Sequence, residues 1–86
     1  MKSTEKEVIN IMIEEAAEVI QSLTKVLRFG YNSTHPLTPH YSNRQHVETE
    51  IGDMLCMLSI MYKLDMINID NIEKAAGHKL DKLFND

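Results

Sequence analysis

The segment Val8–Leu27, VINIMIEEAAEVIQSLTKVL, decides the fold of this chain. Its apolar residues recur at spacings of three and four, and they cover more than half of a helical wheel drawn at about 100° per residue. The main stripe consists of Ile9, Ile13, Ala16, Ile20, Leu23 and Leu27, and a neighbouring sector consists of Val8, Met12, Val19 and Val26. A helix that is apolar most of the way round is buried on most of its sides.

The segments on either side also have helical periodicity, and the chain shows no credible strand pattern. We expect one domain over residues 1–86, with helices at about 5–29, 43–64 and 70–83 and a long loop at 30–41 that contains both prolines. Capping boxes are predicted at Thr4–Glu7, Ser42–Gln45 and Asp70–Glu73, and Gly30 is the expected end of the first helix. The fold class is therefore all-α, a helical bundle.

The small size of the chain bears on how such a helix is buried. A chain of 86 residues buries a thin core, and its single cysteine, Cys56, excludes a disulfide framework. Cys56 lies in an apolar run, where a lone cysteine is usually a small buried hydrophobe. A second copy is the simplest cover for the first helix, so we expect oligomerisation, as a homodimer or a dimer of dimers.

The charge balance excludes several classes of function. Asp and Glu outnumber Lys and Arg by 13 to 9, which gives a net charge of −4. This balance argues against binding to nucleic acid or to an anionic membrane, because both need a basic surface. The chain has no apolar leader, and its best apolar stretch, residues 51–64, is too short and too polar to span a bilayer. A cytoplasmic location is expected.

Four carboxylates occupy positions that solubility does not explain. Glu15 lies in the apolar sector of the first helix, and Glu18 lies at its edge one turn further along. Glu50 and Asp53 are embedded in the apolar run of the second helix. Each pair has i, i+3 spacing, which places its members on adjacent turns of one helical face.

Carboxylates buried among apolar residues are costly unless they are protonated, paired or bound to metal. A single Glu-x-x-Glu is usually a solvated pair on a helix surface, but a second pair inside an apolar run favours a metal site. The basic residues nearest in sequence, among them Arg44 and His46, are too few to neutralise all four acids. Hard oxygen ligands suit Mg²⁺, with Mn²⁺ as a substitute.

These motifs resemble those of a known family. Glu14-Glu15-Ala16-Ala17-Glu18 followed by Glu50-Ile51-Gly52-Asp53 is similar to the EExxE…ExxD signature of the MazG-like all-α nucleoside triphosphate pyrophosphohydrolases, which are related to dimeric dUTPases and dCTPases. The resemblance covers about residues 5–84 and implies that Glu15, Glu18, Glu50 and Asp53 bind Mg²⁺. Family members usually have fewer residues between the two motifs, and the extra length here falls in the loop at 30–41.

The resemblance implies hydrolysis of a nucleoside triphosphate to a nucleoside monophosphate and pyrophosphate. Glu14 and Glu18 are the candidate catalytic residues, as carboxylates that would accept a proton from the attacking water. Basic residues expected to contact phosphate are Lys25 and Arg28 after the first motif and Lys79 and Lys82 on the third helix. Asn32, Tyr41 and Asn43 are weaker candidates for a base or sugar pocket.

Two other functions remain open at this point. One is a non-catalytic helical module for oligomerisation or regulation, although such a module has no reason to bury four acids. The other is hydrolysis of a different pyrophosphate-bearing nucleotide, such as an alarmone or a damaged dNTP. The histidines form no HExxH motif and no Glu-x-x-His occurs, which disfavours a zinc protease or a ferritin-like di-iron site.

Overall fold

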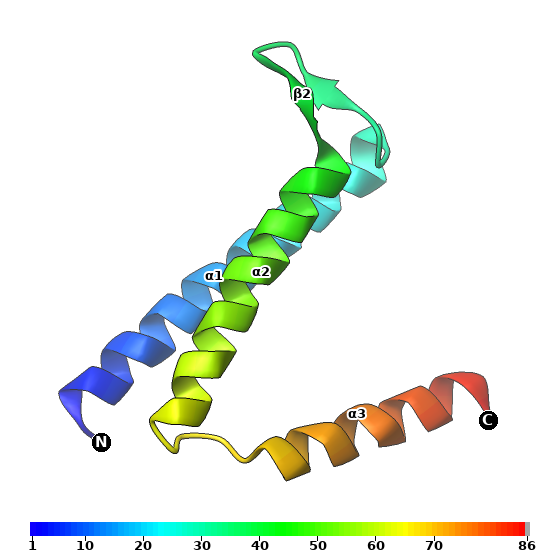
Figure 1. Ribbon diagram of the computed structural model, residues 1–86. Coiled ribbons are helices and arrows are strands. Elements are labelled where there is room, and N and C mark those ends of the chain that lie inside the picture. The colour runs from blue at the N-terminus through cyan, green and yellow to red at the C-terminus, as the bar shows by residue number, and fades with distance from the viewer. Residues whose placement is uncertain (86) are drawn as a thin grey trace.

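Two long antiparallel helices form the body of the molecule. The computed structural model describes residues 1–85, in which α1 (Ser3–Phe29) and α2 (Asn43–Lys63) pack side by side along most of their lengths (Figure 1). Both helices lie within two residues of their expected bounds. Together with the third helix they make the fold all-α, as the sequence predicted.

The two apolar surfaces of α1 have different environments. Residues of the sector Val8, Met12, Val19 and Val26 are buried or half-buried, so this side of α1 packs on α2. Val47 and Met57 of α2 complete this thin core, and Ser22 is fully buried and donates to the carbonyl oxygen of Val19 at 2.8 Å. The main stripe is largely uncovered: Ile13, Ile20 and Leu27 are 61%, 63% and 87% exposed, whereas Ile9 and Ala16 are half-buried.

The segment between α1 and α2 is a β-hairpin, so the expectation of a plain loop at 30–41 is wrong. Strands β1 (Thr34–His35) and β2 (Thr38–Ser42) are antiparallel, with Thr34 opposite Ser42 and His35 opposite Thr38. Pro39 lies inside β2 and has no N–H to donate, which a two-stranded sheet tolerates because each strand has a free edge. The hairpin stands at the end of the molecule where α1 ends and α2 begins (Figure 1).

Local hydrogen bonds explain where the helices begin and end. At the start of α2, Ser42 Oγ accepts from Gln45 N at 3.2 Å and Gln45 Oε1 accepts from Ser42 N at 2.8 Å, which confirms the predicted capping box. The other two predicted caps are wrong. Glu5 accepts from Lys2 N, so α1 begins before Thr4. Asn68, and not Asp70, caps the third helix, because its side chain accepts from the backbone of residue 71.

Helix α3 (Ile69–Phe84) leaves the opposite end of the α1–α2 pair and extends away from it (Figure 1). The chain turns at Asp65, whose φ of 59° lies in the left-handed region that Asp tolerates. Every α3 residue is exposed, including the apolar Ile72, Leu80 and Leu83. The chain measures 43 × 40 × 16 Å and has a radius of gyration of 16.0 Å, against about 12 Å for a compact domain of this length.

The outer side of α2 is also uncovered. Cys56 is exposed, contrary to the expectation of burial, because this side of α2 faces neither α1 nor α3. Within residues 1–85, no helix combines the length and apolar character needed to cross a membrane.

Candidate metal centre

Three of the predicted carboxylates meet where α1 packs on α2. Glu15 of α1 and Glu50 and Asp53 of α2 each offer an oxygen, and these three oxygens lie within 4.8 Å of one another. Glu50 is only 8% exposed, Glu15 is half-buried and Asp53 is exposed, so the cluster opens to solvent on the side of Asp53. The i, i+3 spacing on α2 aims both acids at the same turn of α1.

Two oxygens of this cluster are buried without a partner. Among the side chains of residues 1–85, Glu15 Oε2 and Glu50 Oε2 are inaccessible to solvent and accept no hydrogen bond. A buried carboxylate oxygen without a donor is unfavourable, because it has lost its water and gained nothing in return. A cation between the helices would satisfy both oxygens, and three carboxylates are the hard donors that Mg²⁺ and Mn²⁺ prefer. The residues therefore fit a divalent metal.

The electrostatic environment raises the pKa of both buried acids. Burial raises the pKa of Glu15, and the negative charges of Asp53, Glu18 and Glu14 raise it further. Burial likewise raises the pKa of Glu50, and the nearby Glu18 carboxyl group adds to the effect, while His46 opposes it. Both shifts have the same origin, which is negative charge gathered in a poorly solvated place. A bound cation reverses this effect.

The remaining acids of the first motif surround the cluster. Glu18 is exposed, and its carboxyl group is close enough to raise the pKa of Glu50, but it is not a member of the three-acid cluster. Glu14 is exposed and acts on Glu15 through its charge. Both acids are therefore exposed at the edge of the cluster, where Glu18 influences Glu50 on the facing helix and Glu14 influences Glu15 on its own helix.

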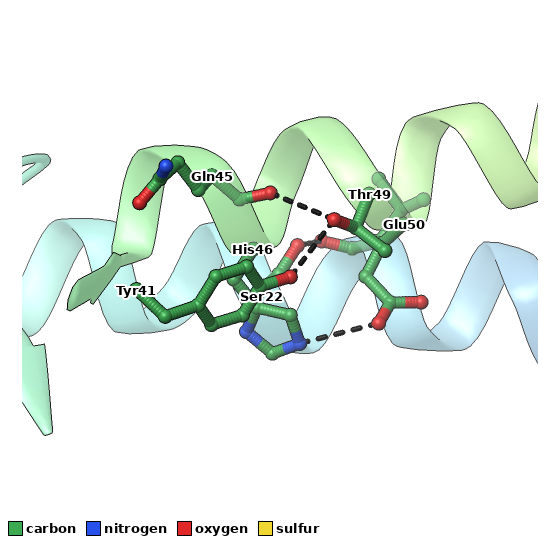
Figure 2. A network of polar contacts seen from close by, with 7 residues as sticks. Ser22, Tyr41, Gln45, His46, Thr49 and Glu50 are labelled. Atoms are coloured by element: carbon green, nitrogen blue, oxygen red, sulfur yellow. Dashed lines mark hydrogen bonds and ion pairs between the residues drawn. The ribbon is translucent and has the colours of Figure 1, made fainter. Parts of the chain in front are cut away.

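His46 is a member of this site that the sequence analysis did not select. Its Nε2 atom lies 3.2 Å from Glu50 Oε1, one turn earlier on α2 (Figure 2). The rings of His46 and Tyr41 are 5.9 Å apart, and the Tyr41 hydroxyl donates to Thr49 Oγ1 at 2.8 Å. Thr49 in turn donates to the carbonyl oxygen of Gln45. The i, i+4 spacing of His46 and Glu50 is the sequence signal that could have revealed this contact.

The four predicted phosphate contacts fall in three different places. Lys25 lines a cavity between the end of α1 and the hairpin. The Arg28 guanidinium lies over the ring of Phe29, 5.0 Å from its centroid. Lys79 and Lys82 are on α3, which extends away from the α1–α2 pair that carries the carboxylates (Figure 1).

The family assignment agrees with this geometry. The fold and the site define an all-α protein in which two facing helices gather carboxylates that fit a divalent metal. Residues 3–84 match the model of the MazG nucleotide pyrophosphohydrolase domain, so the chain belongs to the MazG nucleotide pyrophosphohydrolase family. Comparisons with curated proteins and with solved structures gave no match.

Proposed function

We propose that this protein is a metal-dependent nucleoside triphosphate pyrophosphohydrolase. Its products would be a nucleoside monophosphate and pyrophosphate, from cleavage between the α- and β-phosphates. The observation that carries the proposal is the convergence of Glu15, Glu50 and Asp53 within 4.8 Å, with two buried oxygens that lack partners. Membership of a nucleotide pyrophosphohydrolase family supplies the reaction class.

Glu15, Glu50 and Asp53 would hold the metal, Mg²⁺ in the first instance and Mn²⁺ as a substitute. When bound, such an ion supplies charge neutralisation for phosphate oxygens and lowers the pKa of a coordinated water. The mixed exposure of the cluster suits this role. Glu15 and Glu50, each with a buried oxygen, would hold the ion from within the helix pair, and the exposed Asp53 would hold it on the side that substrate and water can reach.

A carboxylate at the edge of the cluster would accept the proton of the attacking water. Water attacks the α-phosphorus, a new P–O bond forms, and the bond to the bridging oxygen breaks as pyrophosphate leaves with the electron pair. Glu18 is the preferred candidate base, since it is exposed to water and its carboxyl group influences Glu50 on the facing helix. Glu14, at the surface beside Glu15, is the second candidate.

Phosphate oxygens beyond the carboxylate cluster require basic partners. Lys25 and Arg28 lie on α1 beyond the acids, toward the hairpin end. Lys79 and Lys82 are on α3, which extends away from the carboxylates of its own chain. Their expected contact with phosphate would therefore be made in the site of a second copy. The proposed site is accordingly built from α1 and α2 of one chain and completed by α3 of another.

Self-association follows from the same arrangement. The stripe of α1 and the apolar residues of α3 are exposed, and the radius of gyration exceeds that of a compact domain. Large exposed apolar surfaces mark interaction sites. A second copy that lays its α3 and its α1 stripe against these surfaces would bury both, as a homodimer or a dimer of dimers.

A nucleotide panel with Mg²⁺ or Mn²⁺ tests the proposed reaction. The expected products are monophosphate and pyrophosphate, with no turnover when EDTA is present. Release of orthophosphate would refute α–β cleavage. If only an alarmone or a damaged dNTP is hydrolysed, the substrate is a different pyrophosphate-bearing nucleotide. Absence of turnover together with absence of metal binding by calorimetry would favour a non-catalytic module.

A further inference from the structure

The hairpin encloses a cavity of about 530 Å³ at the end of the molecule where α1 ends and α2 begins. Lys25 and Phe29 of α1 form one wall, the hairpin turn with His35 and Leu37 forms another, and His46 of α2 lies toward the carboxylates. This volume lies within the range of about 300–1,000 Å³ that is usual for small-molecule sites.

The lining of this hairpin cavity differs in charge from the rest of the chain. The protein has more acids than bases, yet no Asp or Glu of the described residues lines the cavity, whereas Lys25, His35 and His46 do. Phe29 and Leu37 add apolar surface. A cavity with basic groups and an aromatic ring suits a flat, polar heterocycle that carries hydrogen-bond acceptors and an attached anion.

Hydrogen bonds hold the hairpin in place, so the cavity is formed before any ligand arrives. The backbone N–H groups of Asn43 and Arg44 donate to the carbonyl oxygens of Ser33 and Tyr31, each at 2.9 Å. The Asn43 side chain donates to the carbonyl oxygen of residue 30 at 3.0 Å. These bonds use the first N–H groups of α2, which are therefore not free to bind an anion.

His35 is set up as a hydrogen-bond donor. The backbone N–H of Leu37 donates to His35 Nδ1 at 3.1 Å, so the neutral ring accepts at Nδ1 and carries its proton at Nε2. The Nε2–H group is then available for a carbonyl or ring nitrogen of a bound base. His40 is the other histidine of the hairpin, and it does not line the cavity.

The position of the cavity relative to the carboxylates fits one part of a nucleotide. His46 lines the cavity and contacts Glu50, and the two residues are one turn apart, about 6 Å along the helix axis. In a nucleotide the α-phosphate is bonded directly to the sugar, so a nucleoside must lie next to the phosphorus that reacts. The hairpin cavity is a site of the right size in that place.

We propose that the hairpin cavity binds the nucleoside part of the substrate, with the base against Phe29 and Leu37 and His35 Nε2–H donating to it. This assignment rests on the proposed function, since it places a nucleotide on the carboxylate cluster. It makes the hairpin the element that selects among bases. Pyrophosphate, which has no nucleoside, engages the phosphate-binding part of the site and leaves the cavity empty.

Kinetics of the metal-loaded enzyme test the assignment through matched hairpin variants. His35→Ala should raise the KM for the preferred nucleotide about 3- to 10-fold, and His40→Ala should leave it unchanged. Leu37→Asp, at a position 85% exposed and so tolerant of substitution, should raise KM about 10-fold or more through charge repulsion. The inhibition constant of inorganic pyrophosphate should stay within about twofold of wild type throughout. An unchanged KM in both cavity variants, or a parallel loss of pyrophosphate affinity, would overturn the proposal.

A binding measurement separates this proposal from the proposed reaction. A nucleoside monophosphate titrated into the ¹⁵N-labelled wild-type protein with Mg²⁺ should shift the amide signals of residues 34, 35, 37 and 38, and pyrophosphate should not. If wild type hydrolyses no nucleotide but these signals shift, the proposed function fails and the cavity assignment is supported. If wild type turns over nucleotide while these signals stay still, the cavity assignment fails and the proposed function survives.

Discussion

The Nε2 atom of His46 lies 3.2 Å from Oε1 of Glu50, while the other oxygen of the same carboxylate is buried without a partner. His46 therefore holds one oxygen of Glu50 and restricts the orientation of the whole carboxylate, whose second oxygen has no partner. A side chain that orients a ligand in this way tunes metal affinity without touching the metal. His46 is thus a positioning residue for the carboxylate cluster.

Replacement of His46 should weaken metal use more than it weakens the fold. His46→Ala is expected to lower kcat/KM about 10- to 100-fold and to raise the Mg²⁺ concentration needed for half-maximal activity. His46→Gln, which keeps an amide donor at similar reach, should recover part of both losses. Activation curves over a Mg²⁺ series measure the effect. A normal Mg²⁺ requirement in His46→Ala would show that the contact is only structural.

Glu50→Gln should affect activity and metal-free stability in opposite directions. Glu50 is a proposed metal ligand, so its replacement is expected to lower turnover at least about 100-fold. The metal-free variant should nevertheless unfold at a higher temperature than wild type at neutral pH, because it lacks a buried charge with an unpartnered oxygen. Turnover assays and thermal unfolding in EDTA measure the two effects. Glu48→Gln, at an exposed position on the same helix, is the matched control and should change neither.

The metal-free protein should lose stability as pH rises above the ordinary carboxyl range. The pKa values of Glu15 and Glu50 are raised above 4.5 in the folded state, so the folded chain holds more protons than the unfolded chain just above that pH. Their contribution is therefore most favourable below pH 4.5 and is lost as pH rises through the folded-state pKa values. Thermal unfolding in EDTA over a pH series measures this trend, with Glu50→Gln expected to show a smaller one.

Added Mg²⁺ should reverse the trend, because the metal binds the deprotonated carboxylates. The increase in unfolding temperature on adding Mg²⁺ should therefore grow with pH over the same series. The contradicting outcome is an unfolding temperature of the wild type in EDTA that stays constant or rises with pH, with the same pH dependence in Glu50→Gln. That outcome would show that the cluster carries no unfavourable buried charge.

The sequence predicted the elements of this site better than their surroundings. Periodicity located α1 and α2, and apolar neighbours distinguished Glu15 and Glu50, of which Glu50 is buried and Glu15 is half-buried. Glu18, whose apolar surroundings are weaker, is correspondingly exposed and outside the three-acid cluster. In an α-helix, spacing alone determines which face a residue occupies, so the sequence was sufficient to predict the positions of these acids.

The hairpin and the contact of His46 with Glu50 could not be predicted from residue spacing in the same way. Residues 34–42 contain two prolines and no alternation of apolar and polar side chains, and backbone bonds from Asn43 and Arg44 hold the residues just before the first strand. The contact of His46 with Glu50 depends on side-chain rotamers. Periodicity also shows that a helix has an apolar face, but it does not identify the surface that covers this face. Helix α3 is an example, because its apolar residues have helical spacing and yet all of its residues are exposed.

The exposed stripe of α1 provides the last prediction. Ile20 is 63% exposed, and full burial of such a side chain in a partner interface contributes about 1.5–3 kcal/mol per copy. Ile20→Asp removes that gain and adds a charge that must be desolvated in each subunit, so self-association should weaken at least about 100-fold. Sedimentation over a concentration series measures the shift, with Asn10→Asp at an exposed polar position of α1 as the control. If α3 of a partner completes the active site, activity per chain should fall in parallel with assembly. A wild-type protein that sediments as a folded monomer would refute the interface, and full activity in monomeric Ile20→Asp would show that the site needs no second copy.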